Sequence, residues 1–219
     1  MKSLATFGSL GAKLAIVAAA TVGGTALVGS SVFASLTATA SNTSAHSVTS
    51  GTLKFTQAAS GVSGLTAGFS TAVTGLAPGD TINRFIDLTN GGTLAGASWT
   101  LGLADSATTK LTTDAVNGLA VVVKECTVAY TTVTGACSGT ETTMVTTTAN
   151  ALLTAQSLTV AAADLLPAAV AHTKFVISLP ASSEVTNNGT LPGSTIQGLT
   201  SLLTWTFTET QRAGTNTVA

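Results

Sequence analysis

Strict alternation of apolar and polar residues is clearest in Leu203-Thr204-Trp205-Thr206-Phe207-Thr208. In an extended strand successive side chains point to opposite faces, so a period of two places the three apolar residues on one side and the three threonines on the other. β-branched and aromatic residues also favour a pleated, half-buried strand. This stretch therefore predicts a β-strand that borders a hydrophobic core.

Similar runs recur upstream and are separated by Gly, Pro, Asn and Asp residues. The apolar members of these runs are Leu53 and Phe55, then Trp99, Leu101 and Leu103, then Phe175, Ile177 and Leu179. The last of these runs lies in a strand predicted over residues 173–179, and one further strand is predicted over residues 82–88. Turns are predicted at residues 77–80, 90–92, 187–189 and 191–193. Short alternating strands between turn signals predict an all-β fold, a jelly-roll-like antiparallel β-sandwich.

Helical content is expected to be low. The Ala-rich residues 148–157 and 161–165 are the best candidates, although each fits a loop as well. Residues 131–148 are mostly Thr, Ser and Gly, so we expect an exposed excursion from the sandwich, tethered by its cysteine.

The first 34 residues have the features of a signal peptide. Lys2 and Lys13 precede an uncharged apolar run over residues 14–32, and the small residues around Phe33 predict cleavage between Ala34 and Ser35. An uncleaved membrane anchor is the alternative, but the many Gly and Ala residues make this run weakly hydrophobic. We expect a secreted chain without a stable membrane anchor. Beyond the cut, it comprises an N-terminal segment (35–50), the sandwich (51–212) and a C-terminal tail (213–219).

Charged residues are scarce, at 8% of the chain. Beyond the predicted cleavage site the eight Lys and Arg residues fall to six, against nine acids. Binding of nucleic acid requires clustered cations, so this class of function is excluded. Low charge combined with β-forming residues favours association between strand edges.

Cys126 and Cys137, with ten residues between them, are the only cysteines. In an exported chain such a pair predicts a disulfide that closes a hairpin or loop. A metal or redox role would require further ligands or a CxxC motif.

Catalytic motifs are missing from the sequence. The chain has two histidines, His46 and His172, with no HExxH pair to bind zinc and no GxSxG elbow to expose a serine. We expect both histidines to be exposed or packed, with no cofactor and no enzymatic activity.

Five aspartates are candidates for acid–base pairs or calcium ligands: Asp80, Asp87, Asp105, Asp114 and Asp164. Asp80 follows Pro-Gly in a turn, where its carboxylate can accept backbone N–H bonds, and Asp87 alternates out of a strand whose Ile86 and Leu88 point inward. Structural roles are therefore favoured. Calcium binding at turns stays an alternative, although no DxDxDG loop is present.

The chain as a whole resembles the secreted family of TasA and camelysin, whose signal peptides are cut by a dedicated SipW-type peptidase. The matching segments, in order, are Val32-Phe33-Ala34-Ser35, Gly51-Thr52-Leu53, residues 76–81, residues 84–90, residues 175–180 and residues 205–212. Low charge and the long Thr-rich middle depart from the family pattern.

This resemblance implies a jelly-roll subunit of the cell surface or biofilm matrix that assembles into fibres, alone or with an accessory matrix protein. The N-terminal strand of one subunit would complete the sheet of the next. The corresponding residues here are Leu36, Thr37, Ala38, Thr39 and Ala40, whose alternation suits strand addition. A disordered N-terminus is the alternative for this segment.

Two other classes of function remain open. Camelysin relatives have been labelled zinc metalloendopeptidases, and an activity of that kind would be implied by the family label alone. Many β-sandwiches bind carbohydrate or calcium through loops at their ends, which gives the third possibility.

Overall fold

The computed structural model describes residues 49–60, 68–70, 72–131, 133–181, 189–190 and 195–215. All of them belong to one compact unit, Thr49–Ala219. The predicted signal peptide helix, its cleavage site at Ala34 and Ser35, the predicted donor strand Leu36–Ala40, His46 and the predicted turn at 191–193 lie outside the described residues.

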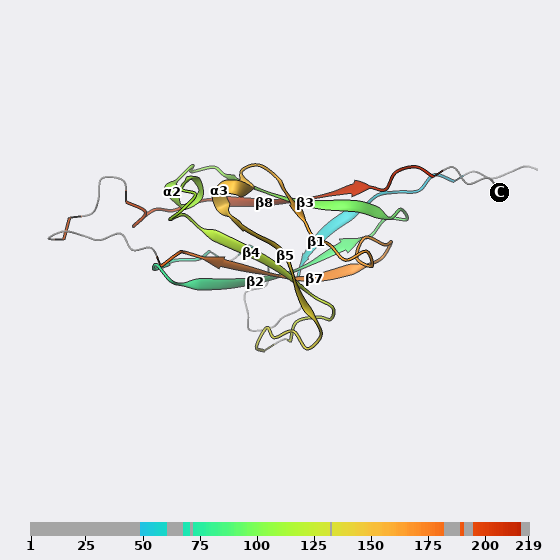
Figure 1. Ribbon diagram of the computed structural model, residues 1–219, viewed down its shortest axis with the longest axis horizontal. Helices are drawn as coiled ribbons and strands as arrows, with labels where there is room; N and C mark the ends of the chain where they lie inside the picture. Colours follow the sequence, from blue (N-terminus) through green and yellow to red (C-terminus); the bar gives the residue numbers. More distant parts are fainter. Residues whose placement is uncertain are drawn as a thin grey trace, which may run out of the picture. The chain divides into compact units, whose positions relative to one another are not determined.

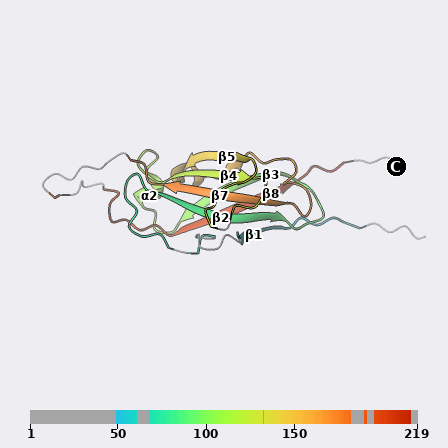
Figure 2. The ribbon, with the colours of Figure 1, turned by 90° about the horizontal axis from the view of Figure 1, so that it is seen from below.

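Two antiparallel sheets pack face to face as a β-sandwich (Figures 1 and 2). The larger sheet has the order β1-β2-β7-β4-β5, with bounds Phe55–Ala59, Thr81–Asn90, Val170–Ser178, Ala120–Cys126 and Glu141–Thr148. The smaller has the order β6-β3-β8, with bounds Gln156–Leu158, Gly96–Asp105 and Leu203–Gln211. The described residues also form two short helices, α2 (Lys110–Thr113) and α3 (Ala149–Leu152). The chain thus has the expected all-β, jelly-roll-like class.

The core lies between the sheets and is built by the alternating residues. Trp99 and Leu101 of β3 are fully buried, and so are Val121 and Val123 of β4 and Phe175 of β7. Full burial of one such side chain contributes roughly 1.5–3 kcal/mol relative to its exposure. The Phe175 ring packs edge-on against Trp205 and Phe207, with centroid distances of 5.7 Å to each. Aromatic packing therefore joins β7 of the larger sheet to β8 of the smaller one.

The predicted strands at 82–88 and 173–179 are confirmed as β2 and β7, and alternation in β3 and β8 places side chains as expected. One prediction about the interior is wrong. Leu53 does not join the core with Phe55, because β1 begins only at Phe55 and Leu53 is 39% exposed.

The Thr-rich residues 131–148 form an excursion only in part. Glu141–Thr148 is strand β5, paired with β4 along its length, and it buries Met144 in the core. Thr is a good strand former, so composition alone could not separate this strand from the loop before it. Of the Ala-rich candidates, 148–157 contains the single turn of α3, begun by Thr148, whose Oγ1 accepts the Ala151 N–H at 3.2 Å, whereas 161–165 has no helix.

The turn at Ala77-Pro78-Gly79-Asp80 forms as predicted. The N–H of Asp80 donates to the Ala77 carbonyl at 2.9 Å, and the Ala77 N–H donates to Asp80 Oδ2 at 2.8 Å. Gly79 has a φ of 94°, a conformation that side chains disfavour. This turn delivers the chain into β2.

Candidate functional site: an open edge between the sheets

The sandwich is closed along one long side by the β5–β6 connection. Helix α3 joins these two strands, and the Thr159 N–H donates to the Met144 carbonyl at 2.9 Å. The Ala149 N–H also donates to the Leu119 carbonyl at 2.7 Å. The edge strands β5 and β6 are therefore connected to each other on this side, through α3 and through backbone hydrogen bonds.

The opposite side ends in two other edge strands, β1 of the larger sheet and β8 of the smaller. Among the described strands, β1 pairs with β2 alone and β8 with β3 alone, the latter from Gly96–Gln211 to Asp105–Leu203. No described strand lies against the free side of either one. The N–H and C=O groups along a free strand edge can pair with an added strand.

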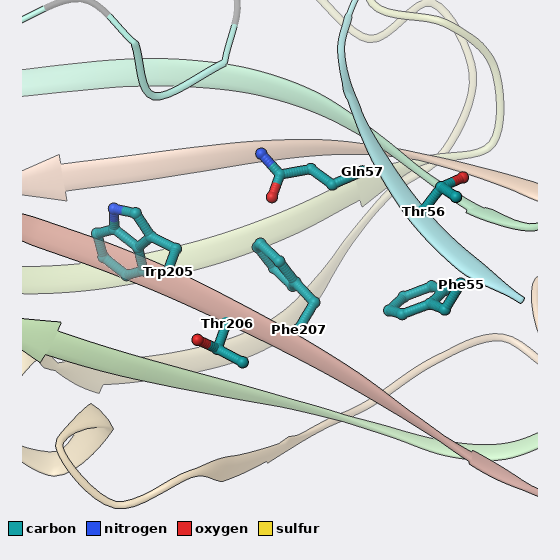
Figure 3. A pocket seen from close by; sticks show the side chains of 6 residues that line it. All are labelled: Phe55, Thr56, Gln57, Trp205, Thr206 and Phe207. Carbon is teal, nitrogen blue, oxygen red and sulfur yellow. The ribbon is translucent and has the colours of Figure 1, made fainter.

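A groove of about 260 Å³ lies between these two edges. Its lining consists of Phe55, Thr56 and Gln57 from β1 and Trp205, Thr206 and Phe207 from β8 (Figure 3). Figure 3 shows Trp205 and Phe207 on one side of β8 and Thr206 on the other. The three aromatic residues are half-buried, whereas Thr56, Gln57 and Thr206 are exposed. The groove thus has an aromatic floor, a polar rim and no charged lining residue.

Packing beneath the groove fixes the aromatic rings. Phe55 lies 4.9 Å from Trp99, and Trp205 stacks on Phe69 at 5.2 Å with 19° between the ring planes. Because these rings also contact the core, the groove exists before any partner binds.

A buried carboxylate lies on the inner face of β8 near its end. Glu209 is 7% exposed, and its Oε1 accepts the Trp99 Nε1–H at 3.1 Å. Among the described residues, Oε2 has no hydrogen-bond partner. A Cβ at Gly96 would lie within 2.4 Å of Oε1, so a larger residue there would displace this buried carboxylate.

The excursion over residues 127–140 packs against the outer face of the larger sheet. The Cys126–Cys137 disulfide closes it, as predicted, and Tyr130 contacts Phe85 edge-on at 5.2 Å. Burial raises the pKa of Tyr130, and the negative charge of the neighbouring Glu141 adds to this effect. The excursion is therefore tethered and also packed, not fully exposed.

Two polar clusters complete this outer face. Glu141 binds Lys124 at 2.9 Å and also pairs with Lys174. Partial burial would raise the pKa of Glu141, but hydrogen bonds from Lys174 and Lys124 outweigh burial and lower it. His172 Nδ1 lies 2.8 Å from Asp87 Oδ1, which confirms that Asp87 points outward.

The remaining predicted aspartates are separate from one another and have structural partners. Asp105 accepts N–H bonds from Ala107, Thr109 and Leu202 and hydroxyl bonds from Thr112 and Ser201. Asp114 accepts the N–H bonds of Val116 and Asn117 in the turn after α2. Sequence reasoning missed the pair of Asp164 with Glu125, although burial of Glu125 follows from its alternation with Val121 and Val123.

Searches against protein-family models and curated proteins find no match to this chain. In the ranges that the structure describes, no helix is long and apolar enough to cross a lipid bilayer. Within the same ranges, no three side chains of His, Cys, Asp or Glu gather closely enough to hold a metal ion.

Proposed function

We propose that this chain is a secreted, fibre-forming protein of the cell surface or biofilm matrix, similar to TasA. In this proposal the segment Leu36–Ala40 of one subunit adds to β8 of the next and covers the groove between β1 and β8. The observation that carries it is the outer edge of β8, on which no strand of the described ranges lies, beside an uncharged aromatic groove. The intramolecular disulfide supports export, because disulfides persist in oxidising compartments.

Strand addition suits the chemistry of both partners. The added backbone gains hydrogen bonds worth about 1 kcal/mol each, and every second side chain enters a groove. Leu36, Ala38 and Ala40 would face the aromatic floor, and Thr37 and Thr39 would face water. The small alanines suit a shallow groove, and the lack of charge on either side avoids a desolvation cost.

The test uses protein beginning at Ser35, compared with a variant that lacks Leu36–Ala40. Light scattering and electron microscopy should show fibres for the first and monomers for the second, with identical far-ultraviolet circular dichroism. A synthetic peptide of residues 35–48 should bind the deleted variant. Its binding would show that the two parts complement each other across molecules.

A matched pair of lysine substitutions tests the edge itself. Thr206→Lys places a charge on the exposed side of β8 at the rim of the groove, and lysines on an edge strand block further pairing, so fibres should be lost. Thr146→Lys changes an equally exposed threonine on β5, the other edge of the larger sheet, and should assemble normally. The proposal is wrong if the chain from Ser35 stays monomeric at every concentration and pH, or if Thr206→Lys assembles like the unchanged protein.

A further inference from the structure

The aromatic floor of the groove between β1 and β8 ends at the buried carboxylate of Glu209. Trp205, Phe207 and Glu209 occupy alternate positions along β8, so their side chains lie on the same side of the strand. The first two line the groove, and Glu209 lies one step further toward the C-terminal end of β8. Glu209 also accepts a hydrogen bond from Trp99, whose ring lies 4.9 Å from that of Phe55 in the groove lining. Glu209 therefore lies at one end of the groove, beside both of its edges.

One oxygen of this carboxylate can accept a further donor. Oε1 accepts the indole N–H of Trp99, whereas the buried Oε2 has no hydrogen-bond partner among the described residues. The salt bridges found in the same part of the chain involve Glu141 and Asp87, not Glu209. Buried polar atoms without a partner are rare in folded proteins, because such an atom loses its bonds to water without replacement. A donor that reached Oε2 would remove this cost.

Strand direction decides which part of an added strand lies next to Glu209. All strand pairs in the described sheets are antiparallel, and antiparallel pairing is slightly more stable per residue than parallel pairing. A strand that adds antiparallel to β8 begins beside the C-terminal end of β8 and leaves beside Leu203. Its N-terminus therefore lies at the end of the groove where Glu209 is found.

The register of the donor segment brings a free amino group to this place. Its apolar residues coincide with the inward residues of β8 when three pairs lie opposite each other: Leu36 with Phe207, Ala38 with Trp205, and Ala40 with Leu203. The position opposite Glu209 then belongs to Ala34, which the predicted cleavage removes. Cleavage leaves the α-amino group of Ser35 there, and such groups have a pKa of about 7.7–8.0, so it is largely protonated at neutral pH.

We propose that Glu209 binds the N-terminal ammonium group of Ser35 from the neighbouring subunit. This inference rests on the proposed strand addition, and it adds the direction of the donor strand and the group that anchors it. The ammonium donates a charge-assisted hydrogen bond to Oε2, while Oε1 keeps the indole N–H of Trp99. Because Oε2 is covered in the structure, the carboxylate rotates toward the groove as the ammonium arrives.

The anchor selects a donor from another subunit. The start of β1 and the end of β8 lie at the same end of the sandwich, because Phe55 pairs with Asn90, Gly96 pairs with Gln211, and a short connection joins Asn90 to Gly96 (Figure 1). A segment that folded back from β1 into the groove of its own subunit would run parallel to β8 and place its N-terminus far from Glu209. Capture of the ammonium thus requires a head-to-tail arrangement of subunits, which generates an open filament.

Two synthetic peptides of residues 35–48, one with a free and one with an acetylated N-terminus, test the anchor on the variant that lacks Leu36–Ala40. Calorimetric titration should show about 10–100-fold tighter binding of the free peptide, the range for a hydrogen bond to a charged group. In Glu209→Gln, which retains an acceptor for Trp99, the two peptides should bind equally. Glu141→Gln removes a carboxylate from the outer face of the larger sheet and is the matched control, so it should keep the preference.

Trp99 reports the place of binding without any change at Glu209. The chain has two tryptophans, so proton–nitrogen NMR spectra contain two indole signals, and Trp205→Phe identifies that of Trp99. The free peptide should shift the Trp99 signal more than the acetylated peptide does. Equal affinity of the two peptides for the variant that retains Glu209, or a preference that survives in Glu209→Gln, would overturn the anchor and leave strand addition standing. Failure of both peptides to bind would overturn strand addition together with the anchor.

Discussion

The unchanged protein should lose stability as pH rises into the alkaline range, and the substitution Glu125→Gln should prevent this loss. Glu125 is 5% exposed on the inner face of β4, close to the carboxyl group of Asp164. Burial, a hydrogen bond to Asp164 and repulsion from it raise the pKa of Glu125 from 4.5 to about 8. Tyr130, a further titratable group that interacts with Glu125, stays neutral across this range. The folded protein therefore holds a proton on Glu125 that the unfolded chain releases.

The direction of the pH effect follows from proton binding. Between pH 4.5 and about 8 the folded state binds more protons than the unfolded state, so the free energy of unfolding falls as pH rises. One unit of pKa corresponds to about 1.4 kcal/mol, which sets an upper limit of roughly 5 kcal/mol. Relaxation and water penetration at the Asp164 loop reduce this limit, so we expect a loss of about 2–4 kcal/mol.

Urea unfolding followed by tryptophan fluorescence at pH 5, 6.5 and 8.5 measures this loss. Glu125→Gln should be nearly as stable as the unchanged protein at pH 5 and more stable at pH 8.5. Glu141→Gln is the control and should lower the free energy of unfolding at all three pH values. The pKa of Glu141 is lowered in the folded protein, so its charged form stabilises the fold above pH 4.5. An unfolding free energy of the unchanged protein that is constant or rises from pH 5 to 8.5 would refute the reasoning.

Three further predictions concern stability in urea. Asp105→Ala should lower the free energy of unfolding by about 2–4 kcal/mol, because the groups that donate hydrogen bonds to its carboxylate lose their acceptor. Burial would raise the pKa of Asp105, but these hydrogen bonds outweigh burial and lower it. The stabilisation that the carboxylate provides should therefore disappear as pH falls through the acid range. Replacing Cys126 and Cys137 by Ser should cost about 3 kcal/mol through loop-closure entropy, and a reductant should then have no further effect. Gly96→Ala should lower the free energy of unfolding by about 1–3 kcal/mol, because the added Cβ overlaps the buried carboxylate of Glu209. Gly102→Ala is its control and should cost less than about 1 kcal/mol, because the atom nearest to the added Cβ is 3.8 Å away.

Alternation identified the strands that face the core. In β8 the pattern from Leu203 to Thr208 was sufficient, because apolar residues there occupy every second position and the threonines between them are exposed. Strand β5 could not be predicted from alternation. Its two apolar residues, Met144 and Val145, are adjacent and lie among threonines, so apolar and polar residues do not alternate there. Leu53 fits the alternating pattern, but it lies before Phe55, the first residue of β1 that pairs with β2.

The candidate functional features depend on contacts between distant parts of the chain. The groove joins Phe55 to Phe207, and the hydrogen bond at its end joins Trp99 to Glu209. Alternation could have placed Arg84 and Glu125 on the inner face of their strands. A charged residue at a core position, however, breaks the expected apolar pattern, and its role becomes visible only when the contacts with the opposing sheet are known. The open edge likewise depends on strand order, which local sequence does not encode.

The packed excursion at 127–140 has a geometric consequence for any assembly of this protein. Tyr130 and the disulfide raise a ridge over Phe85, so the outer surface of the larger sheet is not flat. Amyloid laminates require flat surfaces that interdigitate in dry zippers. In the proposed fibre, this ridge would hinder face-to-face stacking of the larger sheets and so favour extension of the fibre along a single axis.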